Sequence, residues 1–350
     1  MKKALPFVLI AIMLFGLVAC TQPVSSEVLQ SDKQRVTSPV ATQAGLATLV
    51  DGNSAFAFNL YQALKETDDN LFYSPYSISL ALAMTYAGAR GETEEQMANT
   101  LHFTLEDNRL HPAFSDQTEE RIKDLIPKGA IDELTRLVLT NAIYFNAAWQ
   151  YPFEEDATFN GVFYLLNGDK ITVPMMRQTE SFGYAEGDGY QVVELPYDGR
   201  ELSMLVLLPQ TGQFELFEES LNAQRVDDIV KNLNTREVVL TIPKFEFESS
   251  FGLKKTLTAM GMPVAFSAGA DFSGMTGNPD LFIGEVLHKA FVSVDEAGTE
   301  AAAATAVIME LTAMPGEPVE VTIDRPFIFL IRDIESGTIL FIGRVVNPGV

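Results

Sequence analysis

The chain has 350 residues, of which 47% are hydrophobic and 20% charged, and its formal net charge is −23. These proportions are typical of a globular protein with one large core or two modest ones, and they exclude a compositionally disordered chain. The negative charge opposes binding to nucleic acid or to an anionic membrane surface.

The first twenty residues have the layout of a secretory leader. Two lysines precede an apolar run, Ala4 to Val18, which is short for a membrane-spanning helix. The letters LVAC, which end at Cys20, resemble the bacterial lipoprotein box, in which the leader is cut before a cysteine that then carries lipid. We therefore predict a signal peptide over residues 1–19 and a lipid anchor at Cys20, on an extracytoplasmic membrane surface. An ordinary signal peptide with an incidental cysteine is the alternative.

The segment after this cut, residues 20–44, is rich in Ser, Thr, Gln and Pro and has no apolar period. We interpret it as the lipidated cysteine followed by a flexible tether. Because Cys20 is the only cysteine, no internal disulfide is expected in the mature chain. Residues 45–350 contain no internal repeat and are predicted to form a single domain.

Helix signals come early in this domain. Ser74 is a suitable N-cap, Pro75 suits the first helical position, and the apolar run that follows stops at Gly88. In the next segment, ETEEQMANTLHF, the spacing of Thr93 and Gln96 predicts a capping box. Two helices in succession are therefore expected between residues 74 and 103.

Strand signals dominate the rest of the chain. One further helix is predicted to begin at Ser249 or Ser250 and to end at Gly261. Helices first and strands afterwards predict an α+β fold with large, mostly antiparallel or mixed sheets. The predicted strands are RLVLTNAIYF, YQVVELPY, ELSMLVLLP, EVVLTIPKFEF, LFIGEVLHKAFVSVD, VEVTIDRPFIFLIRD and TILFIGRVV.

Catalytic and metal-binding motifs are missing from the sequence. The three histidines, His102, His111 and His288, do not have metal-ligand spacing. There is no GxSxG elbow, Walker A loop or GxGxxG turn. Carboxylate pairs such as Asp227-Asp228 are typical of solvated helix faces in so acidic a chain. We expect no metal, no cofactor and no enzymatic activity.

The stretch DEAGTEAAAATAVIMELTAMPGEP, residues 295–318, joins two predicted strands. With a period of two, one face of this stretch carries no charge and begins with small side chains, so it could slide between two existing strands without burying a charge. Gly298 is a possible hinge. A surface linker that happens to be rich in alanine is the alternative. The uncharged face consists of Thr299, Ala301, Ala303, Thr305, Val307 and Met309.

Seven motifs lie along residues 45–350: VDEAGTEAAAATA, NLFYSPYSISLALAMTYAGARGETEEQMANTLHF, RLVLTNAIYFNAAW, VVELPYDGRELSMLVLLP, LTIPKFEFESSFGLKKTLTAMGM, ADFSGM and DRPFIFLIRDIESGTILFIGRVVNP. Together, and in their order along the chain, they resemble the serpins. The resemblance implies a serpin-like multi-sheet domain with N-terminal helices, a large mixed or antiparallel sheet and an exposed reactive loop over about 297–318. It also implies a suicide substrate of serine proteases, whose loop is cut and then inserts as a new central strand.

The resemblance also implies roles for individual residues. Trp149 and Lys244 match the breach, where insertion begins, and Lys244 matches the usual salt-bridge partner of the first hinge residue, Glu296. A polar cluster beneath the sheet centre, the shutter, matches Ser74, Ser77, Asn141 and His288. The hinge matches Glu296, Gly298, Thr299, Glu300, Ala301, Ala302, Ala303, Ala304 and Thr305. Thr299 is the first of these whose side chain must turn inward.

Counting from Glu296 as in inhibitory relatives places the scissile bond between Thr312 and Ala313. Counting back from DRPF leads to Pro315 instead, but a bond flanked by proline is a poor protease site. A small residue before the cut favours elastase-like or subtilisin-like targets, whereas Leu311 and Met314 keep a chymotrypsin-like target open.

One departure from the serpin pattern is large. Several helices and the two outer strands of the main sheet are expected between LHF and RIKDLIP, yet HPAFSDQTEERIKDLIPKG joins these almost directly. The missing block includes the basic helix that binds heparin in some relatives, so no heparin site is evident. The strand RLVLTNAIYF would become a sheet edge. A non-inhibitory serpin-like binding protein or an inactive truncated serpin is therefore the alternative function.

Overall fold

The computed structural model describes the domain in six stretches. Residues before position 41, including the predicted leader, Cys20 and most of the tether, lie outside them. None of the helices in the described stretches is long and apolar enough to cross a membrane. The described residues are 41–65, 69–105, 109–110, 113–114, 138–299 and 317–349.

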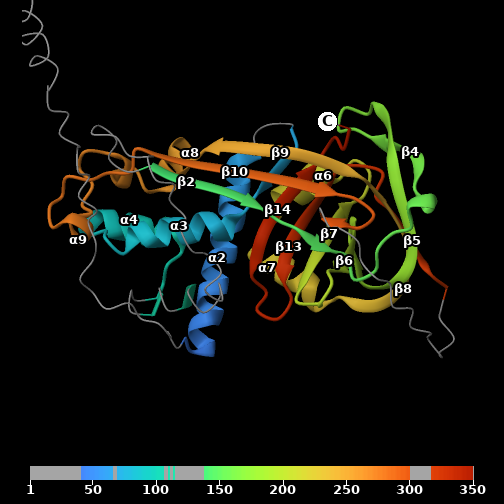
Figure 1. Ribbon diagram of the computed structural model, residues 1–350, viewed down its shortest axis with the longest axis horizontal. Helices are drawn as coiled ribbons and strands as arrows, with labels where there is room; N and C mark the ends of the chain where they lie inside the picture. The colour runs from blue at the N-terminus through green and yellow to red at the C-terminus, as the bar shows by residue number, and fades with distance from the viewer. Residues whose placement is uncertain are drawn as a thin grey trace, which may run out of the picture. The chain divides into compact units, whose positions relative to one another are not determined.

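The described helices are mostly short, and the longest is the first (Figure 1). It begins at Gln43 and so includes the last two residues that had been assigned to the tether. Thr42 caps it by accepting a hydrogen bond from the Gly45 amide at 3.1 Å. The α-helices are α2 (Gln43–Leu64), α3 (Pro75–Tyr86), α4 (Gly91–Leu101), α6 (Phe214–Glu219), α7 (Ala223–Lys231), α8 (Lys254–Met260) and α9 (Ser273–Thr276), with 3₁₀ turns η1 (Glu155–Ala157) and η2 (Val264–Phe266).

The described strands form two sheets. The larger has the order β1-β14-β13-β7-β6-β5-β8-β12 with β4 against β5, and the smaller has the order β2-β10-β11-β3 with β9 against β10. The strands are β1 (Leu71–Tyr73), β2 (Val138–Tyr144), β3 (Ala147–Ala148), β4 (Phe159–Tyr164), β5 (Lys170–Gly187), β6 (Tyr190–Pro196), β7 (Leu202–Pro209), β8 (Asn234–Pro243), β9 (Phe245–Gly252), β10 (Glu285–Val294), β11 (Gly298–Thr299), β12 (Val319–Thr322), β13 (Phe327–Asp333) and β14 (Ile339–Val345).

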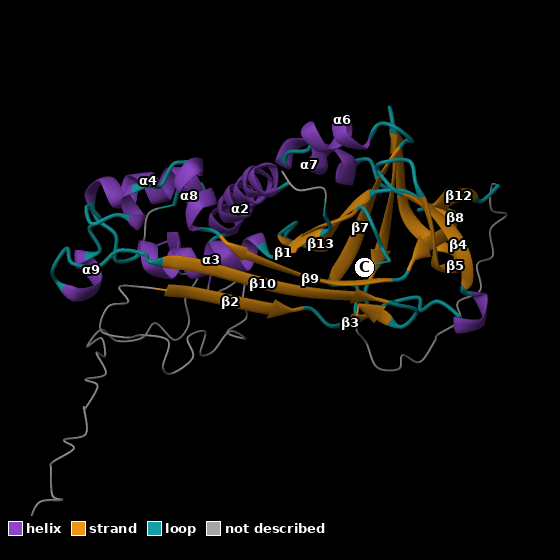
Figure 2. Cartoon of the chain, turned by 90° about the horizontal axis from the view of Figure 1, so that it is seen from above, coloured by secondary structure: helices purple, strands orange, loops and turns teal. Residues whose placement is uncertain are grey.

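The smaller sheet has helices on one side only among the described elements. Figure 2 shows α2, α3, α4 and α8 on the same side of β9, β10 and β2. Strand β10 pairs with β9 antiparallel along one edge and with β2 parallel along the other. Within the described stretches β2 has no second neighbouring strand. It is therefore a sheet edge there, as the missing block predicts.

Phenylalanine rings from three neighbouring strands of the larger sheet, β1, β14 and β13, stack on one another. The ring of Phe72 lies parallel to that of Phe341, with centroids 5.1 Å apart, and stacks on Phe329 at 5.7 Å. All three side chains are buried. Offset stacking of this kind adds about 0.5–1.5 kcal/mol per pair beyond the burial of apolar area. Phe72 also meets the edge of Phe247 in β9, with ring centroids 6.5 Å apart, so the stack contributes to the contact between the two sheets.

The helix predictions are partly confirmed. Helix α3 begins at Pro75 with Ser74 as its N-cap, as expected. The capping box at Thr93 and Gln96 is wrong, because α4 already begins at Gly91 and both side chains face another segment. Thr93 accepts a hydrogen bond from the Asp271 amide, and Gln96 accepts one from the amide of η2. Local spacing could not distinguish a cap from these long-range bonds.

The third helix starts later than predicted. Ser249 and Ser250 lie in β9, opposite Ala290 and Lys289 of β10, and α8 begins at Lys254. The serines are good cap residues in sequence, but the ladder to β10 fixes them as a strand. Strands β1, β3, β4, β5 and β11 had not been predicted. The predicted strand EVVLTIPKFEF covers β8 and the start of β9, and VEVTIDRPFIFLIRD divides into β12 and β13, whereas the other five predicted strands match β2, β6, β7, β10 and β14.

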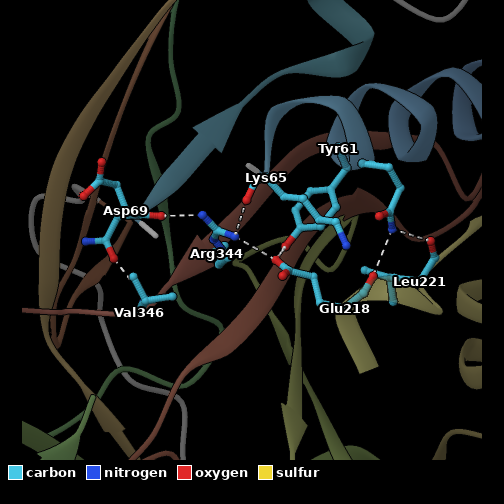
Figure 3. Close-up of polar contacts among 9 residues, drawn as sticks. Tyr61, Lys65, Asp69, Glu218, Leu221, Arg344 and Val346 are labelled. Carbon is cyan, nitrogen blue, oxygen red and sulfur yellow. Dashed lines mark hydrogen bonds and ion pairs between the residues drawn. The ribbon is translucent and has the colours of Figure 1, made fainter. Parts of the chain in front are cut away.

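A buried polar network ties the last strand to the helices (Figure 3). The Arg344 guanidinium donates to Oε1 of Glu218 at 3.0 Å, and the Tyr61 hydroxyl donates to the same oxygen at 2.6 Å. Further bonds run from Arg344 to the carbonyls of Lys65 and Asp69. Burial, followed by the nearby Glu218 carboxylate, raises the pKa of Tyr61 well above its usual value, so the phenol stays a donor.

Removing the carboxylate of this network should destabilise the fold strongly. Glu218→Ala leaves the Arg344 cation buried without its counter-charge, so we expect a loss of about 3–5 kcal/mol in the free energy of unfolding. Glu215→Ala, on the exposed face of the same helix, is the matched control and should stay within about 0.5 kcal/mol. Urea titration of both variants measures the difference. Equal losses in the two would contradict the network's role.

Candidate functional site

The first residues of the predicted reactive loop already belong to the smaller sheet. Strand β11 consists of Gly298 and Thr299, and it lies between the end of β10 and strand β3. Thr299 pairs antiparallel with Val294 of β10 and with Ala147 of β3. The sequence predicted that Thr299 turns inward during insertion. In this structure its side chain is inside the sheet while the chain is intact, with none of its surface exposed.

A tight turn brings the chain from β10 back into the sheet. The Asp295 carboxylate accepts hydrogen bonds from the amides of Ala297 and Gly298, at 2.9 and 3.2 Å. Trp149 holds the turn from the other side, because its indole Nε1 donates to the Asp295 carbonyl at 2.9 Å and its amide donates to the Ala297 carbonyl. Trp149 thus lies against the turn that joins β10 to β11, next to the first residues of the predicted reactive loop.

Lys244 and Glu296 form an ion pair at this turn. The Lys244 ammonium is 2.6 Å from Oε2 of Glu296, and the Thr158 hydroxyl donates to the other carboxylate oxygen at 2.7 Å. Partial burial raises the pKa of the Glu296 carboxyl, but these hydrogen bonds outweigh it, so the pKa lies below its usual value. The carboxylate is therefore charged at neutral pH. Sequence reasoning had not found Thr158, because no local pattern marks it.

Tyr197 is a second residue that the sequence did not single out. Its ring stacks on the Trp149 indole, with centroids 4.7 Å apart and 10° between the planes. Its hydroxyl is 2.8 Å from Oγ1 of Thr299. The tyrosine directly follows β6 and is at the end of the segment VVELPY, where only its place after a predicted strand could have drawn attention to it.

The four predicted shutter residues lie together beneath the sheet. Asn141 of β2 is opposite His288 of β10, and its side-chain oxygen is 3.2 Å from Nδ1 of the histidine. The Asn141 amide donates to the carbonyl and the hydroxyl of Ser77. The Ser74 amide donates to Nε2 of His288 at 3.1 Å. The cluster therefore links two strands of the sheet to the first turn of α3.

These contacts require a neutral His288. Nε2 accepts from a backbone amide, so the ring proton is on Nδ1, where it can be donated to Asn141. Burial lowers the pKa of His288 to about 4. Protonation at Nε2 would turn a hydrogen bond into a clash of two donors, and it would place a cation beneath the sheet.

His288 should make the stability of the protein depend on pH. Its pKa is lower in the folded chain than in the unfolded chain, where it is about 6.5, so stability is complete above that value and is lost as the pH falls. Between pH 7 and pH 5 the loss should be about 2 kcal/mol. We expect His288→Gln to lack this slope.

Urea titrations of the parent and of His288→Gln at pH 7 and at pH 5 measure this loss of stability. Partial burial also lowers the pKa of His102, but that contribution is common to both proteins and cancels. Parallel slopes in the parent and the variant would contradict the neutral shutter histidine.

The remaining predicted site residues lie outside the described stretches. These include the lipidation site Cys20, the hinge from Glu300 to Thr305, and the bond between Thr312 and Ala313. Within the described stretches, no group of three or more His, Cys, Asp or Glu side chains is placed to hold a metal ion.

Comparison with protein families decides the identity. A family model described as "Serpin (serine protease inhibitor)" matches residues 51–116 and 112–348. The chain belongs to the serpin family. Its two matched pieces meet at residues 112–116, in the segment where the sequence lacks a block of the usual pattern.

Curated relatives of this serpin share more than a third of its residues. An uncharacterized serpin-like protein of Thermococcus kodakarensis is 38% identical, and the match covers 86% of each chain. The human leukocyte elastase inhibitor is 36% identical over 86% of this chain and 99% of its own. Among solved structures, human thyroxine-binding globulin has a TM-score of 0.74 at 28% identity, covering 87% of this chain and 99% of its own.

The alignments also measure the missing block. The match to the Thermococcus protein runs over 369 positions but takes up 86% of this 350-residue serpin, about 301 residues, so about 68 aligned positions have no residue here. The prediction that a block of several dozen residues is absent is therefore confirmed.

Proposed function

We propose that this serpin inhibits serine endopeptidases as a suicide substrate, by cleavage of its reactive loop and insertion of the loop into the smaller sheet. The observation that carries this proposal is strand β11, which pairs on both sides and is antiparallel to both neighbours. The residues that follow Thr299 would extend β11 and separate β10 from β2. Insertion thus continues a pairing that the intact chain has begun.

The exchange of strand partners favours insertion. Entry of the loop breaks the ladder between β10 and β2, which is parallel, and forms two antiparallel ladders in its place. Parallel pairing is slightly less stable per residue than antiparallel pairing. About a dozen inserted residues at roughly 1 kcal/mol each contribute on the order of 10 kcal/mol, comparable to the stability of a whole domain.

The inhibited complex forms by interruption of an ordinary cleavage. The serine oxygen of the protease attacks the Thr312 carbonyl carbon, the peptide bond to Ala313 breaks, and the new amine leaves with the proton that the protease's histidine supplies. Thr312 remains bound to the protease as an ester. Insertion then carries the ester, with the attached protease, along the sheet before water can hydrolyse it.

The small side chain of Thr312 supports an elastase-like or subtilisin-like target, whose pocket is shallow. The relatedness to leukocyte elastase inhibitors points the same way. Leu311 and Met314 keep a chymotrypsin-like target as the alternative.

The test is to mix the purified protein with pancreatic elastase and with subtilisin and to run denaturing gels. A covalent complex and a released fragment whose first residue is Ala313 are expected, whereas no cleavage between residues 305 and 318 would exclude the reactive loop.

An arginine on the inward face of the hinge should convert the inhibitor into a substrate. Ala303 shares the face of Thr299 but comes after the two residues that are already paired, so Ala303→Arg leaves the resting hinge intact and blocks its extension. Burying the unpaired cation costs several kcal/mol, much of the driving force for insertion. Gels should show normal cleavage and loss of at least nine-tenths of the covalent complex.

Ala302→Arg is the matched control, because its side chain would face solvent after insertion. It should form complex at the parent's yield. Equal yields from both arginine variants would show that the loop does not enter the sheet with this alternation.

A non-inhibitory binding protein is the second candidate, and the missing block favours it. In the described stretches β2 pairs only with β10, so if β2 separated from β10 it would have no other strand of the sheet to pair with. A chain of this kind would be cut without trapping the protease. Covalent complex formation at any protease concentration decides against this candidate.

The predicted lipid anchor remains part of the proposal, supported by the leader and by the single cysteine. The protein would then act at an extracytoplasmic membrane surface. Expressed in a bacterial host, Cys20→Ala should lose incorporated radiolabelled palmitate and leave the membrane fraction. Cys20→Ser, whose side chain is closer in size to cysteine, is the matched control and should also lose the label and leave the membrane fraction. Unchanged membrane partition of the two variants would contradict acylation at this residue.

A further inference from the structure

The hydroxyl of Tyr197 lies where the loop enters the smaller sheet. It is 2.8 Å from Oγ1 of Thr299, and the exposed fractions of the two residues are 1% and 0%. Among the described residues, neither hydroxyl has another hydrogen-bond partner. Each hydroxyl therefore satisfies the other in a place that excludes water, and each would be left unpaired without it.

The position of the Tyr197 hydroxyl does not depend on the loop. The ring is stacked on Trp149 and meets the edge of Phe145, with centroids 5.1 Å apart. The Tyr197 amide donates to the Leu202 carbonyl at 2.9 Å, and its carbonyl accepts from the Arg200 amide at 3.0 Å. These neighbours all lie outside the hinge, and they hold the hydroxyl in place whether or not Thr299 is paired.

This fixed hydroxyl can recognise the register of the incoming strand. A slip of one residue turns every side chain of a strand to the other face. Gly298 in the place of Thr299 would offer no hydroxyl, and Glu300 would bring a charge into the buried site. Only the register that points the small uncharged face inward satisfies the tyrosine.

We propose that Tyr197 is a positioning residue that seats Thr299 in register and thereby starts loop insertion, so that it decides how many molecules trap a protease and how many are spent as substrate. This role rests on the inhibitory function proposed above. A seated hinge lets insertion begin at once after cleavage. An unseated hinge must first find its register, and the acyl ester has time to hydrolyse.

Hydroxyl removal gives a distinctive pattern. Tyr197→Phe leaves the Thr299 hydroxyl unpaired in the seated state, and Thr299→Val leaves the tyrosine hydroxyl unpaired, so each single change favours an unseated hinge that water can reach. The double variant has no unpaired hydroxyl, because replacing both partners by apolar groups of similar shape is nearly neutral. It should therefore be seated like the parent.

The test compares these three variants in the full-length protein with subtilisin, by counting the molecules consumed for each protease molecule trapped. The single variants should raise this number several-fold at an unchanged rate of loop cleavage, and the double variant should return it near the parent's value. Tyr151→Phe is the control, since its hydroxyl accepts from Arg200 at an exposed site, and it should match the parent. A double variant as impaired as the worse single would overturn the proposal.

A second readout does not require inhibition. Trp149 is the only tryptophan of the chain, and it contacts both Tyr197 and the Asp295 carbonyl. Its emission should shift to longer wavelength in both single variants and return in the double. If the parent traps no protease, the proposed inhibitory function fails, while this emission pattern still tests the seating of the hinge. Emission equal to the parent's in both single variants would overturn the role of Tyr197.

Discussion

The pairing of one edge of β10 governs the rest of this structure. Along most of its length that edge is bonded to β2, in parallel, and at its end it is bonded to β11, in the antiparallel sense. The same edge therefore serves two strands. The shutter cluster around His288 holds the first partner, and the breach around Trp149 holds the beginning of the second. In the proposed mechanism, β11 lengthens along this edge and β2 leaves it.

Polar groups are buried at two places along this edge. Beneath β2 and β10, the bond between Asn141 and His288 crosses the pair of strands that the proposed insertion would separate. Where β11 begins, the ion pair of Lys244 with Glu296 and the hydroxyl pair of Thr299 with Tyr197 fix the loop's first residues. A slip in register would leave these buried polar atoms unpaired, which adds to the cost of any other register.

The grouping of Trp149 with Lys244 and Glu296, and of the polar residues around His288, was predictable from sequence, because short motifs in a fixed order carry these residues. Thr158 and Tyr197 were not predictable, since their roles depend on contacts with residues more than a hundred positions away. The same reason explains the errors in the helices. Thr93 and Gln96 have the spacing of a cap and Ser249 is a good cap residue, but distant partners determine the conformation of all three. The missing block was visible in the sequence because adjacent family motifs are brought too close together.

The proposed mechanism requires that the intact chain be less stable than the same chain with its loop inserted. Calorimetry of the protein before and after cleavage of the reactive loop tests it directly. Insertion worth on the order of 10 kcal/mol should raise the melting temperature of the cleaved protein by about 10 °C or more. A cleaved protein that melts at the same temperature as the intact one, or below it, would show that the sheet does not accept the loop.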